Sequence, residues 1–426
     1  THKYDAWDHF KVDDTFGGDE ALKDLIKEAH SRNMKVVLDC SLNHVHPRHF
    51  AFQDIVEKGE KSEYKDWFTV FDYPVRFLHR PHLYANTYKV GWDGNAEEYK
   101  TYLEKTFKET KVPVEVVDDD GPIIEPTFKA WWGVPDMPKI NFKNDGARQW
   151  ALDVTEHWIK NFDIDGWRMD VAKELDFSFW KDFRDVAYSA KKDILLISEI
   201  FGDTSQWLQG ERFDGTMNYS FRETMTDYFA TKRIDNKEFA NSLANLYSMY
   251  SFEALSSCQN LLSSHDVKRF LNRCGANTDG MFGAIFLQAT FPGIAGIYYG
   301  DEIGLGGADD PFNREPFPWE SEDKWNKDLL KFTSELMNIK TSQPILRYGN
   351  FEMVTYDDNY VIFRRVLNDE SLLCIVNRDL NNNDIELNTN AHSVDMVYGD
   401  CSIELDSGKL KITDIADNFG LIIKES

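Results

Sequence analysis

Residues 164–170 read Ile-Asp-Gly-Trp-Arg-Met-Asp, and this segment decides the fold. A short apolar run that ends on a carboxylate is typical of a buried strand in a parallel sheet. Because side chains alternate along a strand, we expect Arg168 and Asp170 to share the interior face. The arginine would then lower the pKa of Asp170 and keep the carboxylate ionised, as a nucleophile requires. Taken alone, however, the segment favours a structural Arg–Asp pair.

Five further runs of this kind alternate with amphipathic stretches along the chain. Such alternation predicts an α/β fold in which right-handed crossovers join parallel strands. Several strands end on a polar or charged residue, which favours a (β/α)8 TIM barrel with its active site at the carboxyl ends of the strands. The other predicted strands are 35–39, 194–200, 213–217, 259–262 and 293–299, and the predicted helices are 18–33, 147–162, 176–191, 237–255, 279–290 and 325–341.

Two regions depart from this alternation. Residues 45–140 form an excursion long enough for a small inserted domain after the third strand. From residue 344 the pattern changes to period-two strands, which predicts a C-terminal antiparallel β-sandwich domain. We therefore expect a partial barrel start at 1–44, the inserted domain at 45–140, the continued barrel at 141–343 and the β-domain at 344–426. An eight-stranded barrel cannot close on six strands without two open edges, so the first strands are expected to be missing from this chain.

Composition narrows the classes of partner. The formal net charge of the 426 residues is −25, which argues against nucleic acid or an anionic membrane surface and suits a neutral ligand such as a carbohydrate. No apolar run is long enough to predict a membrane-spanning helix. The five cysteines form no CxxC pair, which predicts free thiols and a cytoplasmic location. Secretion is the alternative, because a signal peptide could have been removed before Thr1.

Three more polar groups follow predicted strands, and each has two readings. Glu199 is interpreted either as a general acid or as a loop residue. The pair His265-Asp266 is interpreted either as a group that stabilises developing positive charge or as the N-cap of the next helix. Asn43-His44 suits a sugar-binding histidine or a plain turn. A retaining glycosidase needs two carboxylates about 5–5.5 Å apart, one to attack the anomeric carbon and one to protonate the leaving oxygen. The occurrence of all these groups at strand ends, in order, favours the catalytic readings.

These segments resemble, in order, the four motifs of the α-amylase family of glycoside hydrolases: residues 39–44, 166–174, 197–200 and 263–266. The resemblance implies that Asp170 is the nucleophile and Glu199 the acid/base. It implies that Asp266 is the third carboxylate, which holds a distorted sugar ring.

The same resemblance implies a set of substrate-binding residues, and it leaves a calcium ion open at Asn43 with no cofactor required. Trp131 and Trp132 are interpreted either as platforms on which a sugar ring stacks or as residues of the core. The implied substrate-binding residues are His2, Tyr4, His44, Trp131, Trp132, Arg168, Glu174, His265, Asp310 and Arg314.

Residues 134–141, together with Glu174 after Lys173, resemble the neopullulanase, cyclomaltodextrinase and maltogenic amylase branch. We therefore expect a retaining enzyme that cleaves α-1,4 and also α-1,6 bonds in cyclodextrins, maltodextrins, pullulan or starch, with some transglycosylation. The alternatives are a glucanotransferase or trehalose synthase-type enzyme on the same triad, and a non-catalytic carbohydrate-binding or chaperone-type subunit. The branch also implies a homodimer formed through an N-terminal part that is not in this sequence.

Overall fold

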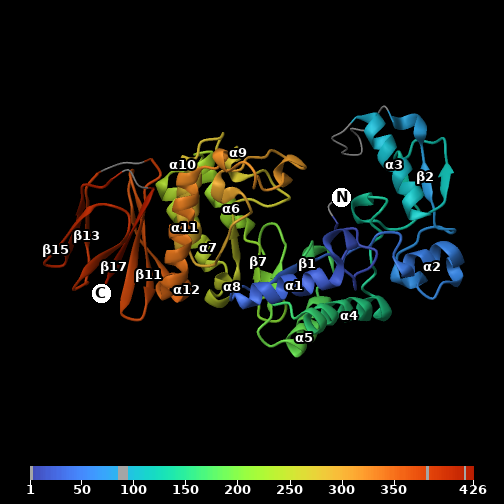
Figure 1. Cartoon of the computed structure of the whole chain (residues 1–426), viewed down its shortest axis with the longest axis horizontal. Helices are drawn as coiled ribbons and strands as arrows, with labels where there is room; N and C mark the ends of the chain where they lie inside the picture. Colours follow the sequence, from blue (N-terminus) through green and yellow to red (C-terminus); the bar gives the residue numbers. More distant parts are fainter. Residues whose placement is uncertain (1–2, 85–94, 380–382, 417–418) are drawn as a thin grey trace. The chain divides into compact units, whose positions relative to one another are not determined.

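The computed structural model describes residues 3–84, 95–379, 383–416 and 419–426, and Figure 1 traces the chain. The chain divides into two compact units. The first comprises residues 1–199 and 211–213, and the second comprises residues 200–210 and 214–426. Each unit is built around parallel strands that alternate with helices in the sequence.

The first unit contains the parallel strands β1 (Val37–Cys40), β5 (Gly166–Met169) and β6 (Leu195–Ser198), in the order β1-β5-β6. All four residues of β5 are buried. The helices α4 and α5 pack against each other beside this sheet (Figure 1). The helices of the unit are α1 (Gly18–Ser31), α2 (Phe50–Lys58), α3 (Ala96–Thr110), α4 (Asp145–Phe162) and α5 (Phe179–Ala190).

Between β1 and β5 lies a small three-stranded sheet with the order β3-β2-β4. Its strands are β2 (Phe77–His79), β3 (Val114–Val116) and β4 (Ile124–Pro126). Helix α3 begins with a capping box, in which Asn95 accepts the Glu98 amide and Glu98 accepts the Asn95 amide.

The second unit contains β7 (Gly215–Thr216), β8 (Gln259–Leu261) and β9 (Ile294–Gly296). Strands β8 and β9 are parallel, and Met217, just past β7, bridges Gln259 in parallel. Strands β1, β5, β6, β7, β8 and β9 thus correspond to the six predicted ones, and the inserted sheet adds a further parallel pair, β2 with β3. The helices are α6 (Tyr219–Met225), the π-helix η8 (Thr226–Ala230), α7 (Asn236–Ser248), α8 (Phe252–Ser257), α9 (Phe270–Arg273), α10 (Asp279–Thr290), α11 (Lys327–Ser342) and α12 (Pro344–Tyr348).

The sequence predicts that α10 is amphipathic, but in the structure every residue from Met281 to Thr290 except Phe282 is buried. Its carboxyl end is satisfied by two buried cations. Lys340 Nζ donates to the carbonyl of Ala289 at 3.0 Å, and Arg365 Nη1 donates to that of Thr290 at 2.6 Å. These hydrogen bonds satisfy carbonyl groups at the end of the helix that have no partner within the helix.

The C-terminal part of the second unit consists of two antiparallel sheets, with the orders β10-β11-β12-β17-β14 and β13-β16-β15. A continuous apolar core, which includes Ile362, Leu373, Leu410 and Ile423, joins strands of both sheets. The strands are β10 (Asn350–Tyr356), β11 (Val361–Leu367), β12 (Glu370–Val376), β13 (Ile385–Asn388), β14 (Val394–Tyr398), β15 (Ser402–Asp406), β16 (Lys409–Thr413) and β17 (Gly420–Glu425).

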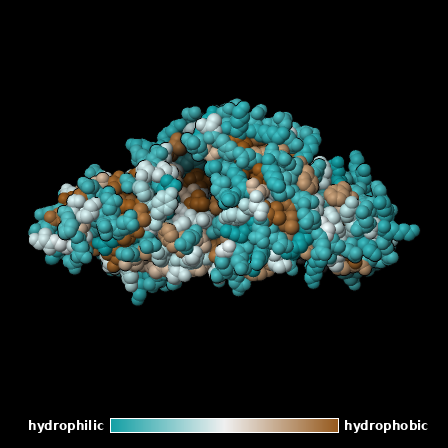
Figure 2. Space-filling model, turned by 90° about the horizontal axis from the view of Figure 1, so that it is seen from below, coloured by the Kyte–Doolittle hydropathy of each residue, from teal (hydrophilic) through white to brown (hydrophobic). Residues whose placement is uncertain are grey.

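Hydrophilic residues cover most of the face drawn in Figure 2, in keeping with the high net charge. Within the described ranges, none of the helices has the length and apolar character needed to cross a bilayer.

Candidate active site

Arg168 is the centre of a charged cluster at the carboxyl ends of β1, β5 and β6. Its Nη1 donates to Asp39 Oδ1 at 2.8 Å and to Asp170 Oδ1 at 3.1 Å. Its Nη2 forms an ion pair with Glu199 Oε1 at 2.9 Å, at an angle outside hydrogen-bond geometry. The parallel register explains the grouping, because it pairs Asp39 with Arg168 and Arg168 with Ile197, two residues before Glu199. The two carboxylates predicted to carry the chemistry therefore converge on one guanidinium.

Burial governs the ionisation of Asp170, whose exposed fraction is only 8%. Removal from water raises the pKa of Asp170 to about 7; the Arg168 charge opposes this rise, and the negative charges of Glu199 and Asp39 add to it. The expected low pKa is therefore wrong in its net direction. One guanidinium is shared by three carboxylates, so it cannot offset the loss of solvation at each.

Glu199 is held through both its side chain and its main chain. Its Oε2 accepts the backbone N–H of Val171 at 3.0 Å. Its own N–H donates to the Met169 carbonyl at 2.9 Å, and its carbonyl accepts the Ala172 N–H at 3.2 Å. The strand end thus presents a buried, fixed carboxyl group, as a general acid requires.

Tyr4 joins the cluster from the N-terminal segment. Its hydroxyl donates to Asp39 Oδ2 at 2.6 Å, and burial raises the pKa of Tyr4 well above its usual value. A cavity of about 380 Å³, lined among others by Tyr4, Asp39, Ser41 and Trp167, adjoins this contact. Its volume lies in the usual range for small-molecule sites. His2, also predicted as a binding residue, lies outside the described residues.

A row of three aromatic rings leads from His44, which is buried, to the surface. His44 stacks on Trp131 with ring centroids 5.2 Å apart, and Trp131 stacks on Trp132 at 5.1 Å. Trp132 is 83% exposed and has a left-handed backbone with φ of +51°. Its exposure favours the platform reading for Trp132, whereas Trp131 lies between the two rings.

Glu174 contacts the other segment that carried the branch resemblance. Lys139 Nζ donates to Glu174 Oε2 at 2.8 Å, so residues 134–141 and the end of the second motif meet in space. Sequence reasoning did not identify Lys139 as a site residue, because its partner lies 35 positions away.

Asn43 was the predicted calcium ligand. Its side chain is fully buried, its Nδ2 contacts His44 Nδ1 at 3.1 Å, and its Oδ1 has no hydrogen-bond partner among the described residues. However, no group of three His, Cys, Asp or Glu side chains suited to a metal ion occurs in the described part of the chain. Calcium takes six to eight oxygen ligands, which include amide and backbone carbonyl oxygens, so the calcium ion at Asn43 stays a prediction.

In the second unit, Asp266 lies in a cluster of its own. His265 Nε2 is 3.1 Å and Arg314 Nη2 is 3.7 Å from the Asp266 carboxylate. Arg314 Nε also contacts the His265 carbonyl at 2.9 Å and Asp310 at 3.2 Å. The structure therefore brings together four predicted residues: His265, Asp266, Asp310 and Arg314.

Two residues of these clusters were missed. Asn313 is fully buried, and its Nδ2 donates to the carbonyls of His265 and Val267 at 2.9 and 3.0 Å, which ties the 310–314 loop to the segment that bears Asp266. Asp39 lies at the end of a predicted strand, where catalytic residues belong, but it was not among the predicted site residues.

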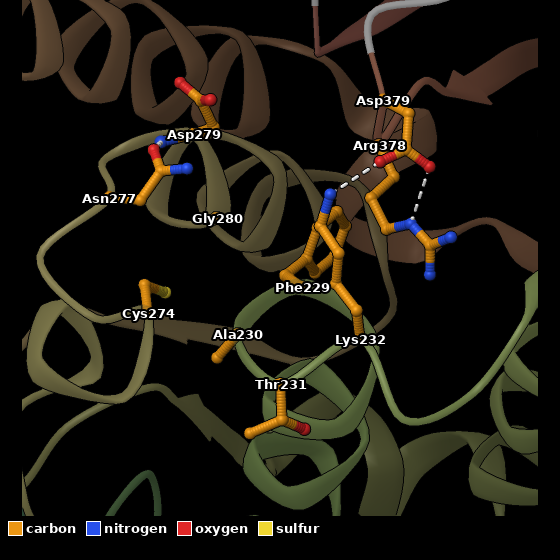
Figure 3. A pocket seen from close by; sticks show the side chains of 10 residues that line it. All are labelled: Phe229, Ala230, Thr231, Lys232, Cys274, Asn277, Asp279, Gly280, Arg378 and Asp379. Atoms are coloured by element: carbon orange, nitrogen blue, oxygen red, sulfur yellow. Dashed lines mark hydrogen bonds and ion pairs between the residues drawn. The ribbon is translucent and has the colours of Figure 1, made fainter.

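A separate cavity of about 350 Å³ lies in the second unit (Figure 3). Its main charged groups satisfy one another, because Asp379 pairs with Lys232 at 2.7 Å and with Arg378 at 3.0 Å. It contains none of the predicted site residues, so we do not assign the chemistry to it.

The family description "Alpha amylase, catalytic domain" matches residues 1–113 and 127–348. The chain belongs to the α-amylase family. The fold class predicted from the sequence, a TIM barrel with a C-terminal antiparallel β-domain, is that of this family and is confirmed.

Individual α-amylase family relatives agree with the branch resemblance. The chain is 35% identical over 378 residues to Neopullulanase 2 of Thermoactinomyces vulgaris, covering 88% of this chain and 57% of the relative. It is 32% identical over 389 residues to a cyclomaltodextrinase of Thermoanaerobacter pseudethanolicus, covering 91% and 60%. The chain thus spans less than two thirds of the length of these relatives.

Solved structures show the same likeness. A cyclomaltodextrinase structure superposes with a TM-score of 0.83 at 29% identity, covering 100% of this chain and 66% of the other. The Nostoc punctiforme debranching enzyme in its native form superposes with a TM-score of 0.83 at 28% identity, covering 100% and 83%.

Proposed function

We propose that this protein is a retaining α-glucan hydrolase that cleaves α-1,4 and also α-1,6 glucosidic bonds in cyclodextrins, maltodextrins, pullulan or starch. The observation that carries the proposal is the convergence of Asp170 and Glu199 on Arg168, at the ends of neighbouring parallel strands. Convergence on one cation supports a pair of carboxylates that act on one glycosidic bond.

In the proposed reaction Asp170 attacks the anomeric carbon while Glu199 gives its proton to the leaving oxygen, so that a glucosyl ester forms on Asp170. Glu199, now a carboxylate, removes a proton from water, which attacks the ester and restores Asp170. Two displacements retain the anomeric configuration. Asp266, with His265 and Arg314 around it, is assigned to the ring hydroxyls of the distorted sugar.

The role of Glu199 is tested with Glu199→Gln on two substrates. Loss of the acid should slow maltoheptaose hydrolysis by orders of magnitude, but α-glucosyl fluoride much less, because fluoride leaves with little help from an acid. Equal losses on both substrates would remove Glu199 from the acid role. Asp170→Asn should abolish turnover of both substrates while maltoheptaose still binds. Glu156→Gln, a half-exposed carboxylate of α4, is the control and should leave both rates unchanged.

Preference within the branch is tested by a product profile on β-cyclodextrin, pullulan and starch. Relatives named cyclomaltodextrinase and neopullulanase, together with the Lys139–Glu174 contact, support a preference for cyclodextrin over starch. The reverse preference would contradict the assignment to this branch. Long transfer products that dominate over glucose and maltose would favour the glucanotransferase alternative.

Two further proposals concern the location and the assembly of the protein. A cytoplasmic location is supported by five cysteines that are free thiols in the structure. A homodimer is proposed from the branch resemblance alone. Fractionation of the source cells tests the location, and light scattering tests the assembly.

A further inference from the structure

The chain turns sharply at Val171, directly after the predicted nucleophile. The backbone of Val171 is left-handed, with φ of +41° and ψ of +43°. This region crowds the Cβ atom, and branching at Cβ makes it worse, so valine rarely adopts it. Such outliers persist where their surroundings fix the chain, and they cluster at functional sites.

Hydrogen bonds fix the chain on both sides of this turn. The Asp170 N–H donates to the Cys40 carbonyl at 3.0 Å, and the Ala172 N–H donates to the Glu199 carbonyl at 3.2 Å. The Ala172 carbonyl accepts Nε1 of the fully buried Trp180 at 2.9 Å. The strained conformation is therefore imposed by neighbours on strands β1 and β6 and on helix α5.

The result of this geometry is a backbone N–H directed at a carboxylate. Val171 donates to Glu199 Oε2 at 3.0 Å, while Oε1 lies 2.9 Å from Arg168 Nη2. Each carboxylate oxygen of Glu199 thus has its own partner, a hydrogen-bond donor at Oε2 and an ion-pair cation at Oε1, so the carboxyl group is held from both sides.

We propose that Val171 is a positioning residue for the acid/base, whose left-handed turn holds its N–H against Glu199 Oε2. This inference rests on the proposed function of Glu199. An N–H donor favours the ionised form of a carboxylate, so the contact strengthens as Glu199 passes its proton to the leaving oxygen. The turn would therefore stabilise the transition state and not only the fold.

An amide-to-ester substitution tests the donor without changing the side chain. Incorporation of α-hydroxyisovaleric acid at position 171 replaces the N–H with an oxygen atom. The matched control is lactic acid at position 172, which removes the bond to the Glu199 carbonyl but keeps the donor to its carboxylate. We expect the 171 ester to lower kcat on maltoheptaose by about tenfold to a hundredfold, as loss of a hydrogen bond to a charged group predicts.

Two further readouts separate positioning from a structural role. In the 171 ester the alkaline limb of the pH–rate profile should move to higher pH, and kcat on α-glucosyl fluoride should fall much less than on maltoheptaose. The 172 ester should leave the limb in place. An equal shift in both esters, or an unchanged profile in the 171 ester, would overturn the inference.

A conventional variant decides the question if the ester chain does not fold. Val171→Gly keeps the N–H and enters the left-handed region without strain, so we expect its alkaline limb to coincide with that of the wild type. A loss of tenfold or more in this variant would show that the valine side chain positions Glu199, which contradicts the inference. A wild type inactive on every α-glucan would instead refute the proposed function itself.

Discussion

Replacement of Arg168 by methionine removes the cation that pairs with Asp39, Asp170 and Glu199. The pKa of Asp170 is about 7 with Arg168 in place, since burial outweighs the arginine. An opposite charge at this range lowers a carboxyl pKa by about 1 to 3, so its loss should raise the pKa of Asp170 by that amount. The nucleophile would then be mostly protonated at neutral pH, and turnover at pH 7 should fall by about fivefold to five-hundredfold.

The assay is kcat/KM on maltoheptaose from pH 5 to pH 10, with urea unfolding on the same samples. In the wild type the acid limb should lie near pH 7, because activity requires ionised Asp170. In Arg168→Met the limb should move upward by about one to three pH units, with partial recovery at pH 10. Loss of the cation from a buried cluster should also reduce the unfolding free energy by about 3–5 kcal/mol.

Arg148→Met is the matched control, because Arg148 is partly buried and pairs with Asp182 at 2.7 Å outside the cluster. It should leave the acid limb unchanged. If Arg168→Met folds and its acid limb coincides with that of the wild type, the electrostatic account of Asp170 is wrong.

Three more outcomes are expected. Asp165→Asn should lower the unfolding free energy in urea by about 3–5 kcal/mol, because the buried carboxylate bonds Lys35, Lys191 and His30; a loss under 1 kcal/mol would contradict this. Burial lowers the pKa of Lys340 to about 7, so the unfolded chain binds more protons than the folded chain between pH 7 and about 10.4. The stability of the wild type relative to Lys340→Met should therefore rise in this range by up to about 1.4 kcal/mol per pH unit. If the thermal midpoints of the two proteins follow parallel curves against pH, the lowered pKa of Lys340 is refuted. Trp132→Ala should weaken maltoheptaose binding in calorimetry with an unchanged thermal midpoint, and unchanged affinity would remove Trp132 as a platform.

The sequence predicted those features that depend on local periodicity. The alternation in residues 164–170 places Arg168 beside Asp170, and the apolar runs locate β1, β5, β6, β7, β8 and β9. The net pKa shift of Asp170 was missed because it depends on burial and on Glu199 and Asp39, which the strand register brings from distant segments.

Other misses have similar causes. Helix α10 was expected to be amphipathic, yet tertiary packing covers nearly all of it. Trp131 and Trp132 are adjacent and of the same residue type, so the sequence does not tell them apart. The 83% exposed fraction of Trp132, which follows a left-handed turn of the backbone, shows that this side chain faces the solvent.

The family match ends at residue 348, yet a group the α10 helix depends on lies beyond it. Arg365, on strand β11, donates its Nη1 to the Thr290 carbonyl and bonds the Gly349 carbonyl through Nη2 at 2.7 Å, and it has no exposed surface. A shortened chain cut at the family boundary would leave the buried Thr290 carbonyl without the charged donor that Arg365 supplies. The C-terminal β-sheet module thus supplies a hydrogen-bond donor that caps helix α10. The smallest fragment that folds should therefore include β11.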